Sequence, residues 1–451
     1  MFDNEVTYRV SKYNVAEQTP SGDLLLMNMR TEDCIKLTGG FVSWYLERVQ
    51  KNSFQMDLGT MRNRLVDGGF IISEQFDEAK WVELKHRETL YGSDVLAVTL
   101  MPTNDCNFRC AYCYQTPTPV YMDEAVEKRV IRFFERKVPH SKKVRVSWFG
   151  GEPLLNREQT CRMASAINEI CKKNHVPLIS TINTNGYNLD VDTFKYLVSC
   201  RLLEYEVCLD GPPDIHNKMR PHKDNPDSFS TILNNLINIQ RYVKTKTFEV
   251  TLRCNVASET PNYLDEYLSI LAKYFAHDSR FRVYFQGVRD WGGNRINQKD
   301  IPENENSINE LWYDKAVQYG LKSAEAFSLT PFVGYCEANR KNGYIINCDG
   351  TLHKCTIAMY SKYANLDAIG HIDEYGREVI DEGKIAQWMI AEKPLRDKCR
   401  KCKMFPICVG NSCPFKTNIE KKYKCNNLEE VAKAKLRCMD YLNLFSEKDV
   451  I

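Results

Sequence analysis

Three cysteines lie close together in the stretch Cys106-Asn107-Phe108-Arg109-Cys110-Ala111-Tyr112-Cys113. With 18 cysteines in 451 residues, chance would produce this CX3CX2C spacing only about 0.03 times per chain. Three thiolates at this spacing can hold three irons of a [4Fe–4S] cluster and leave the fourth iron without a protein ligand. Catalytic metal sites keep such an open position, whereas a zinc site of three cysteines and one distant residue would be closed and structural.

The cysteine loop follows the first of about six predicted strand–helix units. The first two strands are expected at 96–100 and 144–148, and later ones at 178–183, 203–209, 247–256 and 281–287. Helical spacing of apolar residues marks the segments between them, for example 123–137, 191–199, 228–242 and 261–273. This alternation predicts a parallel sheet with its chemistry at the strands' C-terminal ends. Six units are too few for a closed eight-stranded barrel, so we expect an open partial barrel.

This loop after a first strand resembles the radical S-adenosylmethionine (SAM) superfamily, over roughly residues 95–290. The resemblance implies a [4Fe–4S] cluster on Cys106, Cys110 and Cys113, with the amino and carboxylate groups of SAM on the fourth iron. It also implies one-electron cleavage of SAM to methionine and a 5′-deoxyadenosyl radical, which abstracts a hydrogen atom from the substrate.

Other segments carry motifs of the same family. Gly150-Gly151-Glu152-Pro153 ends the second strand, as the family's GGEP does, and Asp210-Gly211-Pro212 ends the fourth. The cofactor contacts that the resemblance implies are Tyr112 near the adenine, Gly150, Gly151 and Glu152 at the methionine part, Ser180 and Asn183 near the ribose, and Asp210 and Arg220, with the arginine at the carboxylate. Arg253 and Asn255 are further candidates. Strand alternation places Glu204, Glu206 and Cys208 on one face, which we expect to line the barrel lumen.

A second cysteine pattern lies beyond about residue 330. Cys336 and Cys355 bracket Gly350, and Cys399-X2-Cys402-X5-Cys408-X4-Cys413 and Cys425 follow. The pattern resembles the SPASM extension of radical SAM enzymes, although its last internal gap has four residues instead of three. The resemblance implies two auxiliary [4Fe–4S] clusters, three clusters in all: one on Cys399, Cys402, Cys408 and Cys425, the other on Cys336, Cys355 and Cys413. Cys348 is the candidate fourth ligand of the latter; the alternative is an open iron that could bind a substrate thiolate.

The first 94 residues predict a small separate unit. Strands near 13–15, 24–29 and 34–37 precede helices at 41–50 and 57–67, and residues 70–73 are expected in a last short hairpin. This order suggests a winged-helix arrangement, whose sheet edge can accept a peptide as an added strand. It is similar to the recognition element of enzymes that modify ribosomal peptides. The alternative is a stabilising N-terminal cap.

The composition limits the partners and the compartment. Lys and Arg number 61 against 59 Asp and Glu, a net charge of +2, which gives no argument for nucleic acid or membrane partners. No apolar run approaches the roughly 20 residues of a membrane span. The acidic start of the sequence shows no export signal, so we expect a cytoplasmic protein with reduced thiols.

Together these features predict an α/β protein in three parts. They are a winged-helix-like leader-peptide recognition domain (1–94), a partial (β/α)6 radical SAM barrel (95–329) and an Fe–S-stapled SPASM domain (330–451). The predicted function is a maturase that crosslinks a ribosomally made precursor peptide through a thioether or carbon–carbon bond, with a flavodoxin- or ferredoxin-type reductant. The alternatives are a sulfatase-maturase-like enzyme that forms formylglycine, a peptide epimerase, and a non-catalytic iron–sulfur or zinc scaffold. No catalytic acid or base is predicted.

Overall fold

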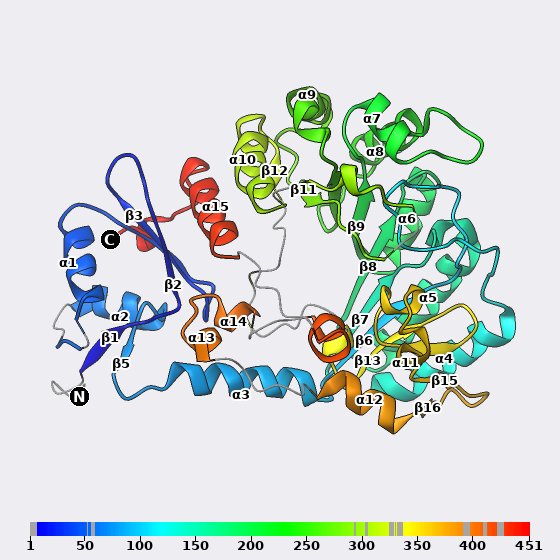
Figure 1. The fold of residues 1–451 in the computed structure, drawn as a ribbon, viewed down its shortest axis with the longest axis horizontal. Helices are drawn as coiled ribbons and strands as arrows, with labels where there is room; N and C mark the ends of the chain where they lie inside the picture. Colours follow the sequence, from blue (N-terminus) through cyan, green and yellow to red (C-terminus); the bar gives the residue numbers. More distant parts are fainter. Residues whose placement is uncertain are drawn as a thin grey trace.

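The computed structural model describes residues 7–51, 53–55, 59–292, 295–302, 305–323, 329, 331, 337–390, 397–408, 413–421 and 428–451. An N-terminal unit lies beside a larger α/β part, and helix α3 (Glu78–Tyr91) runs from the one to the other (Figure 1). No helix among the described residues is long and apolar enough to cross a bilayer.

Six parallel strands form the centre of the large sheet. They are β6 (Val95–Leu100), β7 (Lys143–Trp148), β8 (Leu178–Thr184), β9 (Leu202–Cys208), β10 (Glu249–Val256) and β11 (Phe281–Gly287). The helices that alternate with them are α4 (Glu124–Lys137), α5 (Arg157–Lys173), α6 (Val191–Ser199), α7 (Pro213–Met219) with α8 (Ser228–Tyr242), α9 (Leu264–Phe275) and α10 (Glu305–Gln318). The predicted partial barrel of six strand–helix units is confirmed.

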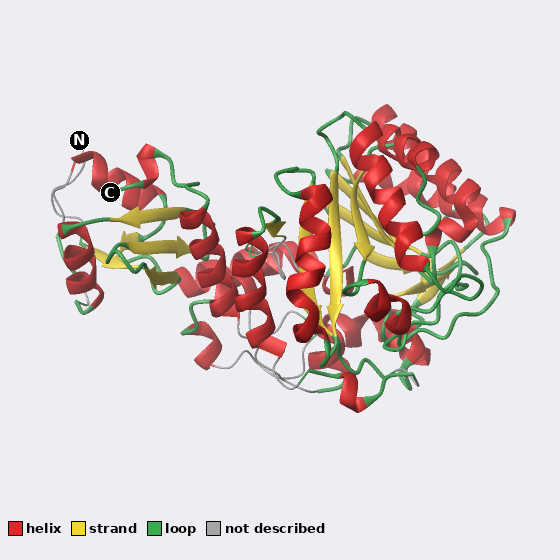
Figure 2. Cartoon of the chain, turned by 90° about the horizontal axis from the view of Figure 1, so that it is seen from above, coloured by secondary structure: helices red, strands yellow, loops and turns green. Residues whose placement is uncertain are grey.

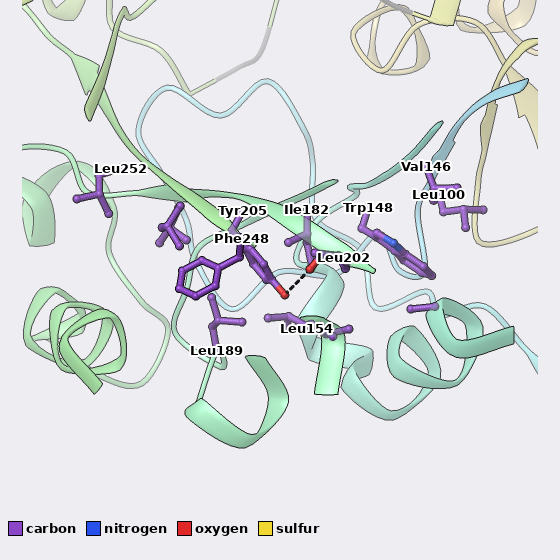
Figure 3. Packing of buried hydrophobic residues seen from close by; sticks show 14 of the residues in the cluster. Leu100, Val146, Trp148, Leu154, Ile182, Leu189, Leu202, Tyr205, Phe248 and Leu252 are labelled. Carbon is purple, nitrogen blue, oxygen red and sulfur yellow. Dashed lines mark hydrogen bonds between the residues drawn. The ribbon is translucent and has the colours of Figure 1, made fainter. Parts of the chain in front are cut away.

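The side of these strands that faces the helices forms the main hydrophobic core. Trp148 and Ile182 come from neighbouring strands, and the Tyr205 hydroxyl donates to the Leu202 carbonyl across 3.0 Å (Figure 3). Each such fully buried large side chain stabilises the fold by roughly 1.5–3 kcal/mol relative to exposure. On β9 Tyr205 is buried and Glu206 is not, so the predicted alternation holds and leaves the polar face toward the inside of the barrel.

The sheet continues beyond the barrel into the C-terminal part of the chain. Strand β13 (Gly343–Ile346) pairs in parallel with β6, and β14 (Thr351–His353), β15 (Gly370–Ile372) and β16 (Glu378–Ile380) follow antiparallel. At the other edge β12 (Lys322–Ser323) pairs with β11. This region has only short elements, as expected, but its buried Tyr344 and Trp388 belong to the barrel core. Apolar packing against the barrel core therefore helps to hold this C-terminal region in place.

The N-terminal unit contains a three-stranded antiparallel sheet of β2 (Asn14–Gln18), β3 (Leu24–Asn28) and β4 (Cys34–Leu37), with β3 in the centre. Helices α1 (Gly40–Val49) and α2 (Gly59–Asp67) follow. The expected last hairpin is wrong, because β5 (Ile71–Ser73) pairs with β1 (Tyr8–Val10) at the start of the unit. The chain then enters α3, whose N-cap Asp77 accepts a hydrogen bond from the Lys80 amide.

Both faces of the three-stranded sheet are covered. Leu26 and Ile35 pack toward α1 and α2, whereas Val15 and Met27 pack toward α14 (Phe405–Cys408) and α15 (Leu428–Tyr441). Helix α15 lies beside β2 and β3 in Figure 1, and both marked chain ends lie on this unit in Figure 2. The C-terminal helix thus packs against the N-terminal sheet, far from it in sequence.

Candidate cofactor site

The loop after β6 carries Cys106, Cys110 and Cys113 and is fixed by main-chain hydrogen bonds to other strand ends. The amides of Arg109 and Ala111 donate to the carbonyls of Pro221 and Met219, both at 2.9 Å. The Gly151 amide donates to the Thr103 carbonyl at 3.1 Å. Segments that follow β7 and β9 therefore hold the loop at the carboxyl end of the sheet.

The two glycines of the GGEP segment permit this close approach. A Cβ on Gly151 would lie 2.0 Å from the Asp105 carbonyl oxygen, and one on Gly150 would lie 2.5 Å from that of Thr103. Gly150 also has a φ of +114°, which side chains rarely adopt. Any larger residue would push the cysteine loop away from β7.

The three thiols lie in a largely buried part of the loop. Cys110 is buried, Cys106 and Cys113 are partly buried, and none is in a disulfide. Burial raises the pKa of the Cys106 thiol to about 11 and raises the pKa values of Cys110 and Cys113 as well. Among the described residues no three His, Cys, Asp or Glu side chains converge on one ion. Three cysteine thiols on one loop match the donor set of a [4Fe–4S] cluster that has one open iron.

Tyr112 lies at the centre of a buried polar cluster beside these thiols. Its hydroxyl donates to the fully buried Asp210 and accepts from Arg220 Nη1 at 2.6 Å and from Asn255 Nδ2 at 2.9 Å. The Asn255 amide holds Asp210 Oδ1 at 2.9 Å. Burial raises the pKa of Tyr112 well above its usual value, so the phenol stays protonated. The structure thus brings three predicted cofactor residues together with Asn255, one of the two further candidates.

The Nε–H group of Arg220 has no hydrogen-bond acceptor at this position. Only 5% of the residue is exposed, and its Nε has no hydrogen-bond partner. The group also lies over the Phe108 ring of the cysteine loop, 5.5 Å from the centroid. An unpaired buried donor costs free energy unless an acceptor arrives. The carboxylate that the resemblance implies for SAM is such an acceptor, so these residues fit the cofactor.

Glu152 ties the GGEP segment to the end of β8. The side chain is 1% exposed, and Oε1 accepts from the Leu154 amide at 2.9 Å and from Thr184 Oγ1 at 2.7 Å. Oε2 accepts from the Asn185 amide at 2.7 Å. Burial raises the pKa of Glu152, although these donors oppose that shift. Most of its acceptor capacity is used inside the protein, so its evident role is to position the two strand ends.

Asn183 belongs to a polar chain that lines the lumen. Its Nδ2 and the Nη1 of Arg253 both donate to Glu206 Oε1 at 2.8 Å. Arg253 Nε then donates to Asn255 Oδ1 at 3.0 Å, which links this pair to Tyr112. Glu206 and Arg253 remain about a quarter exposed, with side-chain values of 26% and 28%. The Glu206–Arg253 pair could be expected from the sequence, because alternation places both residues on the polar faces of their strands.

Ser180 does not join the site. Its hydroxyl accepts a hydrogen bond from the Trp148 indole at 3.2 Å, and the residue is buried with Ile182 on the face toward the helices. Residues three apart on a strand point to opposite faces, so Ser180 and Asn183 cannot both face the lumen. The position of Ser180 corrects its assignment as a cofactor contact.

The described cysteines of the second pattern lie in two separate parts of the structure. Cys336 and Cys425 lie outside the described residues. Cys355 follows β14, and Cys413 precedes the turn Phe415–Ile419; the rings of Tyr363 and Phe415 bring these two loops together, with centroids 5.9 Å apart. Cys399 and Cys408 lie instead beside the core under the N-terminal sheet, and Cys402 is exposed.

Cys348 and Cys355 stand at opposite ends of one hairpin. The pairs Ile346–Leu352 and Ile345–His353 place Cys348 in the turn, near the cysteine loop after β6, and Cys355 beyond the open end. The register therefore does not place the two cysteines opposite each other in the hairpin.

The part of the chain that carries the site is a radical SAM domain. Residues 100–253 match the family model described as the Radical SAM superfamily. This range begins at the last residue of β6 and includes the three cysteines, the GGEP segment, Asp210 and Arg220.

The comparisons extend beyond this domain. The chain is 20% identical over 369 residues to the cysteine-type anaerobic sulfatase-maturating enzyme of Clostridium perfringens (strain 13 / Type A). The aligned region covers 74% of this chain and 95% of that enzyme. Among solved structures, anSMEcpe with bound AdoMet aligns with a TM-score of 0.56 at 18% identity over 78% of this chain and 100% of its own. Streptococcus suis SuiB bound to precursor peptide SuiA aligns with a TM-score of 0.50 at 14% identity over 93% of this chain and 99% of its own. At such identities these structures establish the fold alone.

Proposed function

We propose that this protein is a radical SAM maturase that crosslinks a ribosomally made precursor peptide oxidatively, through a thioether or carbon–carbon bond. The observation that carries the proposal is the N-terminal sheet, which keeps one strand edge for a peptide. A relative of this fold is described as bound to its precursor peptide, and the similarity to it spans more of this chain than the similarity to anSMEcpe.

The free edge is that of β2. Both faces of the sheet are covered, and the β4 edge is occupied because the Ile451 amide donates to the Lys36 carbonyl at 2.8 Å. No strand among the described residues pairs with the outer side of β2. The bond from the Met29 amide to the Tyr13 carbonyl sets the register, in which the amide of Ala16 points outward. A leader peptide added here would gain main-chain hydrogen bonds.

The barrel supplies the reaction site. When bound, the cluster and SAM supply hydrogen-atom abstraction by a 5′-deoxyadenosyl radical. Cys106, Cys110 and Cys113 hold the cluster, and Tyr112, Asp210, Arg220 and Asn255 hold and orient SAM, with Gly150 and Gly151 allowing the backbone to approach. Glu206 and Arg253 present a charged pair to the part of the peptide that enters the lumen.

Two auxiliary clusters complete the proposal. Cys399, Cys402, Cys408 and Cys425 hold one, and Cys336, Cys355 and Cys413 hold the other. Cys348 is the candidate fourth ligand of the second set, and the alternative is an open iron there. An open iron would offer a position for a substrate thiolate, and the auxiliary clusters would take up the electron that leaves the substrate. A flavodoxin or ferredoxin would supply the reducing electron to the SAM cluster.

The test uses the full chain and short peptides encoded next to its gene. With SAM and dithionite, we expect one of them to lose two hydrogens in mass. Ala16→Pro removes the outward N–H of β2 and should raise KM about fivefold, because one main-chain hydrogen bond is worth about 1 kcal/mol. Ala16→Val keeps the N–H and should behave as the native protein. Unmodified peptides, or equal KM values for both variants, would contradict the proposal.

The second candidate is formation of formylglycine, which the sequence relatives favour. Both reactions remove two hydrogens when the target is serine, so mass alone does not separate them. Formylglycine is an aldehyde and reacts with a hydrazide, whereas a crosslinked peptide does not. A modified peptide that forms a hydrazone would therefore decide for the second candidate.

A further inference from the structure

The turn that follows Arg220 lies on the cysteine loop. Phe108 and His222 face each other there in an antiparallel β-bridge, and His222 Nε2 lies 3.2 Å from Asn107 Nδ2. The main chain pairs on both sides of this bridge, through two hydrogen bonds of 2.9 Å: from the Arg109 amide to the Pro221 carbonyl and from the Lys223 amide to the Asn107 carbonyl. The stretch between the first two cysteines of the loop is therefore paired with this turn.

The His222 imidazole packs against two aromatic rings. It stacks on the Tyr187 ring, with centroids 4.2 Å apart and planes at 21°. It meets the Phe108 ring nearly edge to face, with centroids 5.1 Å apart and planes at 85°. Both arrangements are favourable for aromatic pairs. His222 Nδ1 also accepts from the amides of Asp224 at 3.0 Å and Asn225 at 3.1 Å, so the orientation of the ring is fixed from within its own turn.

Tyr187 lies shortly after β8 and is held by helix α8. Asn235 of that helix donates through Nδ2 to the Tyr187 carbonyl at 2.9 Å and to the Gly186 carbonyl at 3.0 Å. These two bonds fix the main chain at the end of β8 to the helix layer of the barrel. The His222 ring therefore lies between a side chain that is anchored to the barrel and the Phe108 ring of the cysteine loop.

Phe108 links this contact to the SAM site. The residue is 1% exposed, and the Arg220 guanidinium lies over its ring, 5.5 Å from the centroid. Arg220 Nη1 in turn donates to the Tyr112 hydroxyl at 2.6 Å. A shift of the Phe108 ring would therefore move the surface against which the guanidinium packs. The four side chains form one continuous series of contacts from His222 to Tyr112.

We propose that His222 is a positioning residue for SAM binding, which acts through the Phe108 ring on the Arg220 guanidinium. No motif that identified the site includes His222. The inference needs the radical SAM domain alone and does not depend on the peptide reaction proposed above. Aromatic pairs of this geometry stabilise packing beyond the area that they bury, so loss of the imidazole ring should weaken SAM binding about fivefold.

The test measures the Kd for SAM by calorimetric titration of the full chain after reconstitution with iron and sulfide without oxygen. His222→Asn removes the ring but keeps an acceptor for the turn, because an Asn side chain accepts from the amide two residues further on. We expect its Kd to rise about fivefold at native iron content. His222→Phe keeps a ring against Phe108 and should bind SAM within about twofold of the native protein.

His175→Asn is the matched control and should bind SAM as the native protein does. His175 is exposed, follows α5 at the opposite end of the strands, and has a φ of +55°, which Asn also adopts. Hydrogen exchange of the same samples should become faster in His222→Asn only in the turn at 221–225 and in the facing stretch of the cysteine loop.

Three results would overturn the inference. Equal Kd values for His222→Asn and His222→Phe would show that the ring does not act on the site. A lowered iron content in His222→Asn would mean that the residue acts on the cluster and not on Arg220. Faster hydrogen exchange throughout the barrel of His222→Asn would mean that the residue stabilises the fold as a whole.

Discussion

The two cysteine-bearing regions of the molecule are built differently. The loop after β6 is held by hydrogen bonds from its own backbone to segments behind β7 and β9, and these bonds involve no thiol. Cys399 and Cys408 lie instead on α13 (Asp397–Arg400) and α14, helices of four residues each. Isolated helices this short are not stable in water.

We expect the two regions to differ in how much of their structure depends on bound iron. The first loop is part of the sheet edge and keeps its shape through contacts that any backbone can make. The region around α13 and α14 packs through Met404 and Phe405 on the N-terminal sheet and has little regular structure of its own. With the proposed clusters, we expect metal binding to contribute to folding there, and to contribute mainly chemistry at the first loop.

The largest expected effect is that of Cys110→Ser. Without one of three ligands the SAM cluster is lost, and production of 5′-deoxyadenosine should fall below detection. The metal-free variant should nevertheless unfold within about 1–2 kcal/mol of the metal-free native protein, since only one buried side chain changes. Hydrogen exchange should still find the amides of Arg109 and Ala111 protected. Loss of that protection would remove the distinction between the two regions.

Cys408→Ser should keep SAM cleavage and lose local structure, the reverse of what we expect for Cys110→Ser. We expect it to lose one auxiliary cluster, to keep SAM cleavage within about twofold, and to expose residues 397–408 to proteolysis and hydrogen exchange, because α14 then lacks the metal that holds it. Cys161→Ser is the matched control, since Cys161 lies partly buried on α5 with no implied ligand role. Equal protection of 397–408 in both variants would contradict the metal-dependent folding of this region.

Much of the barrel could be predicted because its signals are local. The strand at 281–287 was expected where β11 lies, and the one at 178–183 ends one residue before β8 does. The pairing of β13 with β6 joins residues almost 250 positions apart, and no local pattern encodes such a contact. Helix α3 carries few buried residues beyond Glu78 and Val82, so it gives little apolar periodicity to detect.

The site residues also divide into those that local motifs identify and those whose contacts come from distant parts of the chain. Tyr112, Asp210 and Arg220 could be identified from motifs, and the structure brings them together. Asn255 was a further candidate, and its contacts with Tyr112 and Asp210 are known only from the structure.

The smallest expected effect separates two residues of β8. Ser180→Ala removes the acceptor of the Trp148 indole and should lower the free energy of unfolding by about 1 kcal/mol, while the Kd for SAM changes less than about twofold. Asn183→Ala removes a donor from Glu206 inside the lumen, and should raise the Kd for SAM by about three- to tenfold, the equivalent of one hydrogen bond. Calorimetric titration of both reconstituted variants measures the two constants. A larger loss of SAM binding for Ser180→Ala than for Asn183→Ala would mean that the strand turns its other face to the cofactor. The polar chain from Asn183 through Arg253 to Tyr112 would then lie on the wrong side of the sheet.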